Sequence, residues 1–315
     1  MKTIYASEKE AELKKKVFAQ TMQEDFAEFW ANAVKSLREK KIEMKREKLS
    51  LPYDKTFTTY EITFNTHDET IVHAYFSCPN GKEGERLPCV AYYHGGSGAK
   101  SINPDILATG VCCFAIDVRS QSGTTVDRGN YSSGDRMGGI MTRGVLDKNE
   151  FYMKNIYLDA VRAIDVIASL PEVDPDRIVT FGISQGGALS IAASALSGKV
   201  KKSYAVVSSY CCLQQRTESG SGVFDSTHAF LRNYPEHTDT VMRTLSYFDV
   251  INMVSLLKNP ISYCLGLSDP ICLPPYVYSA YHHTKSEKSI EMYPFVAHDY
   301  PMNFRLLVLG ELAAL

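Results

Sequence analysis

The sequence lacks any long hydrophobic run. Its first residues, MKTIYASEKEAELKKK, hold no apolar segment of the kind found in secretory signal peptides, and no later run is long enough to cross a bilayer. It also lacks an excess of charge of one sign, because 34 basic and 36 acidic residues leave a net charge of −2. We therefore expect a cytoplasmic protein that binds neither nucleic acid nor membrane.

The C-x-x-C spacing of zinc and redox sites is absent as well. The eight cysteines include two adjacent pairs, at positions 112 and 113 and at positions 211 and 212. Their spacing favours buried free thiols in a reducing compartment. Basic residues gather between positions 35 and 48, but glutamates alternate with them, which favours a solvated helical face over a binding surface.

What is present is the composition of a globular protein, with 44% apolar and 22% charged residues. The length of 315 residues allows two average domains or one large α/β domain. From residue 87 onward, short apolar runs alternate with helical patterns, which predicts a mostly parallel sheet with helices on both faces. The expected elements are a helix over 8–48, strands over 56–64, 70–77, 87–93, 111–118, 177–181, 203–208, 261–266 and 289–295, and helices over 155–170 and 187–196.

Two segments interrupt this alternation. Residues 120–150 are rich in glycine and polar residues, and residues 213–245 have a partly helical pattern. Segments of this length are usually functional or interface elements. We expect one domain over 1–315, with a helical extension over 1–50, a long loop over 120–150 that can serve as an oligomer interface, and a cap-like insertion over 213–245.

A G-x-S-x-G motif with Ser184 at its centre lies between a predicted strand and a predicted helix. In that setting it is typical of the nucleophile elbow of α/β-hydrolases, a strained turn that lifts the serine out of the sheet. Gly182 and Gly186 leave room for the strand and helix that pack around the turn. The alternative is a glycine-rich connection with an incidental serine.

The other triad residues should follow later strands, in the order acid then histidine. Asp269 follows the strand over 261–266, and His298 follows the strand over 289–295. Alone, Asp269 could be a turn residue before Pro270, and His298 a loop residue. Three other histidines compete, but one precedes the serine and two lie in a predicted helix: His94, His282 and His283. Position and order together favour Ser184, Asp269 and His298 as a catalytic triad, which needs no metal or organic cofactor.

An oxyanion hole should combine the N–H after the serine with one from the loop after an early strand. The first is that of Gln185. The second is expected in the run His94-Gly95-Gly96-Ser97-Gly98, which follows the strand over 87–93 and resembles the HGG loops of esterases. Its alternative interpretation is a plain glycine-rich turn.

Four stretches carry a resemblance over nearly the whole chain: DFAEFW at 25–30, YLDAVRA at 157–163, SQGGA at 184–188 and LSYFD at 245–249. With them, the sequence resembles the acetyl xylan esterase/cephalosporin-C deacetylase family of α/β-hydrolases. The family's G-x-S-Q-G motif is intact, and its His-Glu dipeptide appears as His298 with Asp299.

Two family positions differ. The R-G-Q motif appears as Arg119, Ser120 and Gln121, so that serine replaces a glycine. The tyrosine whose N–H forms half of the family's oxyanion hole appears as Gly96, which keeps the N–H but removes the aromatic side chain. The resemblance implies Gly96 and Gln185 as oxyanion donors, and Arg119 and Gln121 as residues that support the motif.

The resemblance further implies deacetylation of small acetylated sugars and cephalosporin C-like acetates inside the cell, by a homo-oligomer that is a hexamer in the family. Two alternatives stay open. One is an esterase or peptidase with another acyl or amide preference, which the missing aromatic side chain at Gly96 favours. The other is a non-catalytic scaffold on a hydrolase fold, which the altered R-G-Q motif favours.

Overall fold

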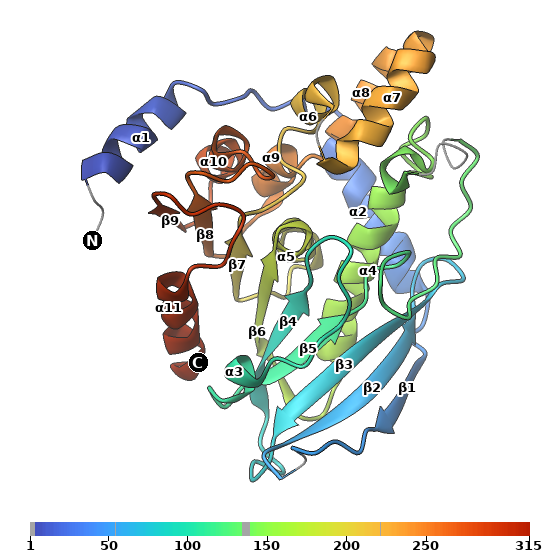
Figure 1. Cartoon of the computed structure of the whole chain (residues 1–315). Helices are drawn as coiled ribbons and strands as arrows, with labels where there is room; N and C mark the ends of the chain where they lie inside the picture. The colour runs from blue at the N-terminus through green and yellow to red at the C-terminus, as the bar shows by residue number, and fades with distance from the viewer. Residues whose placement is uncertain (1–3, 54, 134–138, 221) are drawn as a thin grey trace.

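A sheet of nine strands, in the order β1-β2-β3-β5-β4-β6-β7-β8-β9, runs through the molecule (Figure 1). The computed structural model describes residues 4–53, 55–133, 139–220 and 222–315. No helix within these ranges is long and apolar enough to cross a membrane. The strands are β1 Met44–Lys48, β2 Phe57–Asn65, β3 Ile71–Pro79, β4 Leu87–Tyr93, β5 Cys112–Ile116, β6 Val173–Ile183, β7 Lys202–Val206, β8 Ile261–Gly266 and β9 Lys288–Tyr293.

The strand directions divide the sheet into two parts. Strands β5, β4, β6, β7, β8 and β9 are parallel to one another, whereas β1, β2 and β3 pair in antiparallel fashion and β3 is also antiparallel to β5. Every residue of β5 and β8 is buried, as suits strands covered on both faces, while burial nearly alternates along β2. The strands predicted from residue 56 onward are all found; those over 87–93 and 261–266 have the predicted bounds, and the others are shifted.

Helices cover both faces of the sheet. One face packs against α2 Phe26–Glu39, α4 Tyr152–Ile167, α5 Gln185–Ser197, α9 Val250–Met253 and α10 Pro274–His283. The other face packs against α3 Pro104–Leu107 and the C-terminal α11 Met302–Ala313 (Figure 1). In α4 every residue except Lys154 is buried, so this helix lies at the centre of the larger core.

The helix predicted over 8–48 is wrong in extent. The structure places α1 over Ile4–Lys14, then α2, and then strand β1 over Met44–Lys48. The β1 sequence MKREK has no strong strand propensity, but its Arg46 lies 3.6 Å from the centre of the Tyr60 ring on β2 and forms an ion pair with Glu172 at 2.6 Å. Tertiary contacts therefore override local preference here. The basic cluster at 35–48 is accordingly not one helical face.

The segments 120–150 and 213–245, which interrupt the predicted alternation of strands and helices, differ in their structure. Within the described part of 120–150 the only regular element is the 3₁₀ turn η2 Ile140–Thr142; residues 134–138 lie outside the described residues. The segment 213–245 is helical, as predicted, with α6 Leu213–Ser219, η3 Gly222–Phe224, α7 Asp225–Asn233, η4 Pro235–His237 and most of α8 Thr238–Ser246. Figure 1 shows α6, α7 and α8 beyond the carboxyl ends of the parallel strands. The division into one domain with an extension, a loop and an insertion stays a prediction.

Candidate active site

Ser184 lies in the turn between β6 and α5 in a strained backbone conformation. Its φ of 58° and ψ of −117° fall outside the regions that a side chain normally allows. A Cβ at Gly182 would overlap the backbone of Gly186, and a Cβ at Gly186 would overlap the carbonyl oxygen of Tyr93. The two glycines are therefore required by close packing, and the predicted strand-turn-helix context of the motif is confirmed.

Neighbouring strands hold this turn. The Ser184 N–H donates to the carbonyl of Val206 at 2.9 Å, and the Ser184 carbonyl accepts from the N–H of Ser209 at 2.9 Å. The Ser184 Oγ has no hydrogen bond to a residue that the structure describes. Behind it, α5 begins at Gln185, so that the free N–H groups of its first turn lie beside the serine.

Asp269 and His298 form a hydrogen-bonded pair at the ends of β8 and β9. The His298 Nδ1 lies 2.8 Å from the Asp269 Oδ2. The Asp269 Oδ1 accepts the N–H groups of Ile271 and Cys272 at 2.8 and 2.9 Å, so the buried carboxylate is fixed in one orientation. The hydrogen bond that the His298 ring donates to Asp269 is the largest cause that raises the pKa of His298 above its usual value.

His94 has a different environment. Its Nε2 accepts the N–H of Val118 at 3.0 Å, and its Nδ1 lies 2.7 Å from the carbonyl oxygen of Gly95. These partners require a neutral ring that carries its proton on Nδ1, and burial lowers the pKa of His94 in agreement with this. Both ring nitrogens are therefore used to fix the glycine-rich loop. His282 and His283 lie in α10, as expected.

Gln121 joins the two loops that carry the expected oxyanion donors. Its Oε1 accepts the N–H of Ser97 at 2.9 Å, and its Nε2 donates to the Oε1 of Gln185 at 2.7 Å. The Oε1 of Gln185 also accepts the hydroxyl of Tyr210 at 2.7 Å. The contact to Tyr210 could not be found from the sequence, because no motif marks this residue. The side chain of Gln121 thus fixes the spacing between the loop of Gly96 and the turn of Ser184.

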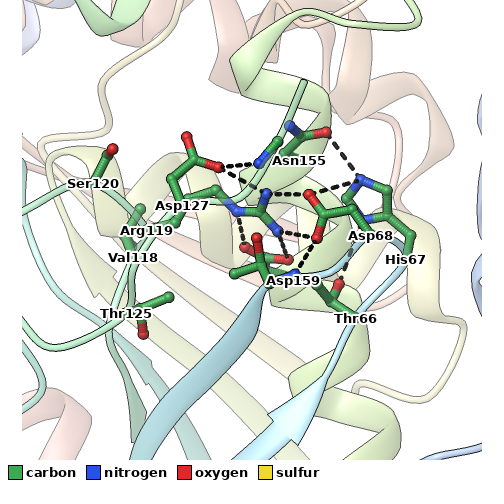
Figure 2. Close-up of polar contacts among 12 residues, drawn as sticks. Thr66, His67, Asp68, Val118, Arg119, Ser120, Thr125, Asp127, Asn155 and Asp159 are labelled. Atoms are coloured by element: carbon green, nitrogen blue, oxygen red, sulfur yellow. Dashed lines mark hydrogen bonds and ion pairs between the residues drawn. The ribbon is translucent and has the colours of Figure 1, made fainter. Parts of the chain in front are cut away.

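Arg119 lies at the centre of a buried ionic network (Figure 2). Its guanidinium donates to Asp159 twice at 2.7 Å, to Asp68 at 2.6 and 3.2 Å, and to Asp127 at 3.1 Å. Burial would raise the pKa of Asp68, but hydrogen bonds and charge from Arg119 outweigh it and lower that pKa to about 2. Sequence reasoning marked Arg119 but not its three carboxylates, which come from separate parts of the chain.

Ser120 replaces the glycine of the R-G-Q motif and adopts its backbone angle. Its φ is 60°, in the left-handed region that disfavours a side chain. Arg143 donates to the Ser120 Oγ at 2.6 Å, and the carbonyl of Thr125 accepts the Ser120 N–H at 3.2 Å. The serine therefore bears backbone strain, and its hydroxyl gains a contact that glycine could not make.

These groups surround one cavity of about 580 Å³. It is lined by residues from the serine turn, the glycine-rich loop, the α6 region and the loop after β8: Gly95, Gly96, Ser97, Gln121, Ile183, Ser184, Gln185, Tyr210, Arg216, Pro270, Ile271 and His298, among others. Apart from the two adjacent residues, no described residue has an atom within 4 Å of where a Cβ on Gly96 would be. The structure therefore brings Ser184, His298, Gln185 and Gly96 to one site, and Asp269 to His298 behind it.

One group of side chains could hold a metal ion. Asp269, Cys272 and His298 each offer a ligand atom, and these atoms lie within 4.8 Å of one another. Two of the three residues already form the hydrogen-bonded pair described above. A metal ion there would replace that hydrogen bond, so this arrangement does not fit a mechanism in which His298 transfers protons.

The family model for acetyl xylan esterase (AXE1) matches residues 9–308. The chain belongs to the acetyl xylan esterase family. Among solved structures, an acetyl xylan esterase from Paenibacillus sp. R4 is 31% identical, covers 96% of this chain and 98% of its own, and superimposes with a TM-score of 0.90. Acetyl xylan esterase 1 from Thermoanaerobacterium sp. JW/SL YS485 is 27% identical with the same coverage and a TM-score of 0.87.

Two further comparisons define the limits of this likeness. Acetyl esterase Axe7A of Xylanibacter ruminicola is 29% identical over 164 residues, which are 52% of this chain but only 37% of that protein. An acylaminoacyl peptidase is 18% identical with a TM-score of 0.56 and shares the fold alone. The predicted family, the α/β-hydrolase fold and the enzyme class of carboxylic ester hydrolases are confirmed.

Proposed function

We propose that this esterase hydrolyses small acetyl esters by two-step acyl transfer, with Ser184, His298 and Asp269 as the catalytic triad. The observation that carries the proposal is that His298, hydrogen-bonded to the buried Asp269 behind it, lines the same cavity as the strained Ser184. Family membership supports acetyl esters as the substrate class.

In the first step, the Ser184 Oγ attacks the ester carbonyl while the Nε2 of His298 takes its proton. The hydrogen bond to Asp269 holds the Nδ1 proton in place and stabilises the imidazolium that forms. The alcohol then leaves with a proton from His298. The structure has no hydrogen bond between Ser184 and His298, and such bonds often form only once substrate is bound.

The negative charge on the carbonyl oxygen is stabilised by the N–H groups of Gln185 and Gly96. Gln185 is the first residue of α5 and Gly96 lies in a turn, so neither N–H has an intrahelical acceptor. The contact of Gln121 with Ser97 and Gln185 keeps these donors at a fixed separation before the substrate arrives. Water then hydrolyses the acyl-enzyme with the same residues in reversed roles.

We propose acetylated xylo-oligosaccharides and cephalosporin C-like acetates as substrates, a cytoplasmic location and a homo-oligomer of up to six subunits. The segment 120–150 is the proposed interface, and the free cysteines support a reducing compartment. Light scattering at micromolar concentration tests the assembly, and a monomer mass would contradict it.

A series of p-nitrophenyl esters tests the activity directly. We expect an acetyl preference, and a loss of several orders of magnitude in kcat for Ser184→Ala with an unchanged circular dichroism spectrum. A fluorophosphonate probe should label the wild-type chain at Ser184 and leave Ser184→Ala unlabelled. Labelling that persists in the variant, or unchanged turnover, would contradict the assignment; no labelling of the wild type would favour a non-catalytic scaffold.

One observation favours a second candidate function, an esterase or peptidase with a larger acyl or amide preference. Open space surrounds the position of a Cβ on Gly96, in a cavity of about 580 Å³. The same ester series distinguishes the two, because butyryl and octanoyl esters would then be hydrolysed faster than acetyl esters. Gly96→Tyr would restore the aromatic side chain of the family and should shift the preference toward acetyl.

A further inference from the structure

We propose that Cys78 and Cys112 are a site of reversible disulfide formation that ties the antiparallel part of the sheet to its parallel part. The Sγ atoms of the two residues lie 2.6 Å apart. A disulfide bond is about 2.05 Å long, so bond formation would bring the sulfur atoms together by about 0.5 Å. Both thiols are free in this structure.

The strand register explains why these two residues meet. Ser77 on β3 lies opposite Cys113 on β5 in an antiparallel ladder, which places Cys78 opposite Cys112. Side chains directly opposite one another in such a ladder have Cβ atoms about 4.5–5.5 Å apart, close to the separation that a disulfide spans. The pair is therefore set by backbone pairing and does not depend on a flexible loop.

The two neighbouring cysteines are unsuitable partners for this disulfide, one because of the direction of its side chain and the other because it is buried. Cys113 is adjacent to Cys112 but points to the opposite face of the sheet, where it packs in the core with α3 and α11. Cys112 and Cys89 pack in the other core, against which Cys78 also lies. Cys89 pairs with Cys112 from the other side but is fully buried, whereas Cys78 is partly exposed.

This difference in exposure sets the order of the chemistry. A small-molecule disulfide is attacked by the Cys78 thiolate, which forms a mixed disulfide and releases one thiolate. The Cys112 thiolate then attacks the Cys78 sulfur and releases the second. Two protons leave the protein and two electrons pass to the small disulfide, which becomes two thiols. The hydrogen bond to Cys112 and burial raise the pKa of Cys78, so the exchange should be slow at neutral pH and faster at higher pH.

The site lies away from the cavity of Ser184. Cys112 is the first residue of β5, whereas Ser184 follows the last residue of β6. Because these strands run parallel, Cys112 lies at their amino ends and Ser184 at their carboxyl ends. The proposal is thus independent of the proposed function. The crosslink would join residues separated by 34 positions and should stabilise the fold without changing turnover.

The experiment exposes the reduced full chain to oxidised glutathione at pH 8.5, followed by alkylation in denaturant and mass spectrometry. We expect a mass decrease of about 2 Da from the loss of two hydrogen atoms, two fewer alkylated thiols, and a crosslink between the tryptic peptides 56–82 and 101–119. Dithiothreitol should restore all thiols. The oxidised chain should melt several degrees higher, with kcat/KM unchanged within about twofold.

Two variants decide which cysteine is used. Cys78→Ser changes a partly exposed residue and should abolish the loss of two thiols. Cys113→Ser is the matched control, because it alters the adjacent thiol on the other face and should leave the crosslink intact. A stable glutathione adduct on Cys78 without the mass decrease, or a crosslink that requires Cys113, would overturn the proposal.

Discussion

The Arg119 network and the Asp269–His298 pair both join a cation-forming side chain to buried carboxylate, but they differ in how much hydrogen-bonding capacity is left. The guanidinium of Arg119 has five N–H donors, and all five are used by Asp68, Asp127 and Asp159. His298 forms its hydrogen bond to Asp269 through Nδ1, the Cys272 thiol lies beside the same ring, and the ring lines the cavity. A side chain whose donors are all hydrogen-bonded stabilises the fold, whereas a ring with a nitrogen left free can still exchange a proton with substrate.

Among the changes that test this comparison, Asp269→Asn should have the largest effect on activity. We expect kcat to fall by about 10²–10⁴-fold, because the amide no longer fixes the imidazole tautomer or stabilises the imidazolium. His298 acts as a base only when neutral, so activity rises as pH rises through its pKa. Since Asp269 raises that pKa, its loss should move the acid limb of the kcat/KM profile to lower pH.

The matched control for this change is Asp299→Asn, at the acid position of the family's His-Glu dipeptide. The Asp299 side chain accepts the N–H of Tyr300 and forms no hydrogen bond or ion pair with His298. We expect its pH profile to match that of the wild type. If Asp299→Asn, and not Asp269→Asn, moved the acid limb, the assignment of the acid would be wrong.

Arg119→Met should affect stability most strongly. It leaves Asp68 and the buried Asp159 without their cation and Asp127 with Arg143 alone, and breaking such a buried ion pair costs about 3–5 kcal/mol. Urea unfolding followed by fluorescence measures it. The exposed Arg128 is a matched control in the same segment, and Arg128→Met should change the free energy of unfolding by less than about 0.5 kcal/mol. Equal free energies of unfolding for the two variants would contradict the prediction that the Arg119 network stabilises the fold more than an exposed arginine does.

The same network predicts a loss of stability in acid. The pKa of Asp68 is about 2 in the folded chain against 3.8 in the unfolded chain, so the unfolded state binds more protons between these values. Its contribution, about 2 kcal/mol, should be complete above pH 4 and should disappear as pH falls toward 2. Asp68→Asn should flatten this part of the pH dependence of unfolding. An unchanged slope in the variant would show that other carboxylates control acid unfolding.

Gln121→Leu should have the smallest effect, confined to turnover. Loss of the bridge between Ser97 and Gln185 should lower kcat about tenfold with little change in KM, because the oxyanion donors lose their fixed spacing. Ser122→Ala is the control, since Ser122 donates to the Ser97 carbonyl but does not touch Gln185. A drop of the same size in both variants would assign the effect to the loop of Ser97 and not to the bridge.

Motifs tied to local geometry could be predicted from the sequence. The strand-turn-helix context of Ser184 and the positions of Asp269 and His298 after late strands follow from chain order and from apolar runs. The structure brings these three residues together as expected, although their catalytic roles stay predictions. The glycine-rich loop was also predictable, because its place after β4 is a local property.

Features that depend on distant contacts were not predictable. Strand β1 was expected to be helical, since nothing within MKREK reveals that Arg46 would stack on Tyr60. The three carboxylates around Arg119 come from a loop before β3, from the segment after β5 and from α4, so no spacing marks them. The contact of Tyr210 with Gln185 has the same origin.

The contact between Ser120 and Arg143 is one that a glycine could not make, because it uses the serine hydroxyl. Arg143 also forms an ion pair with Asp127 at 3.3 Å, so the far end of the segment 120–150 is attached to its beginning at two points. These two contacts hold the residues near position 143 against the first residues of the segment. Glycine at position 120 would relieve the backbone strain but would remove the hydrogen bond to Arg143, while the ion pair between Asp127 and Arg143 would be kept.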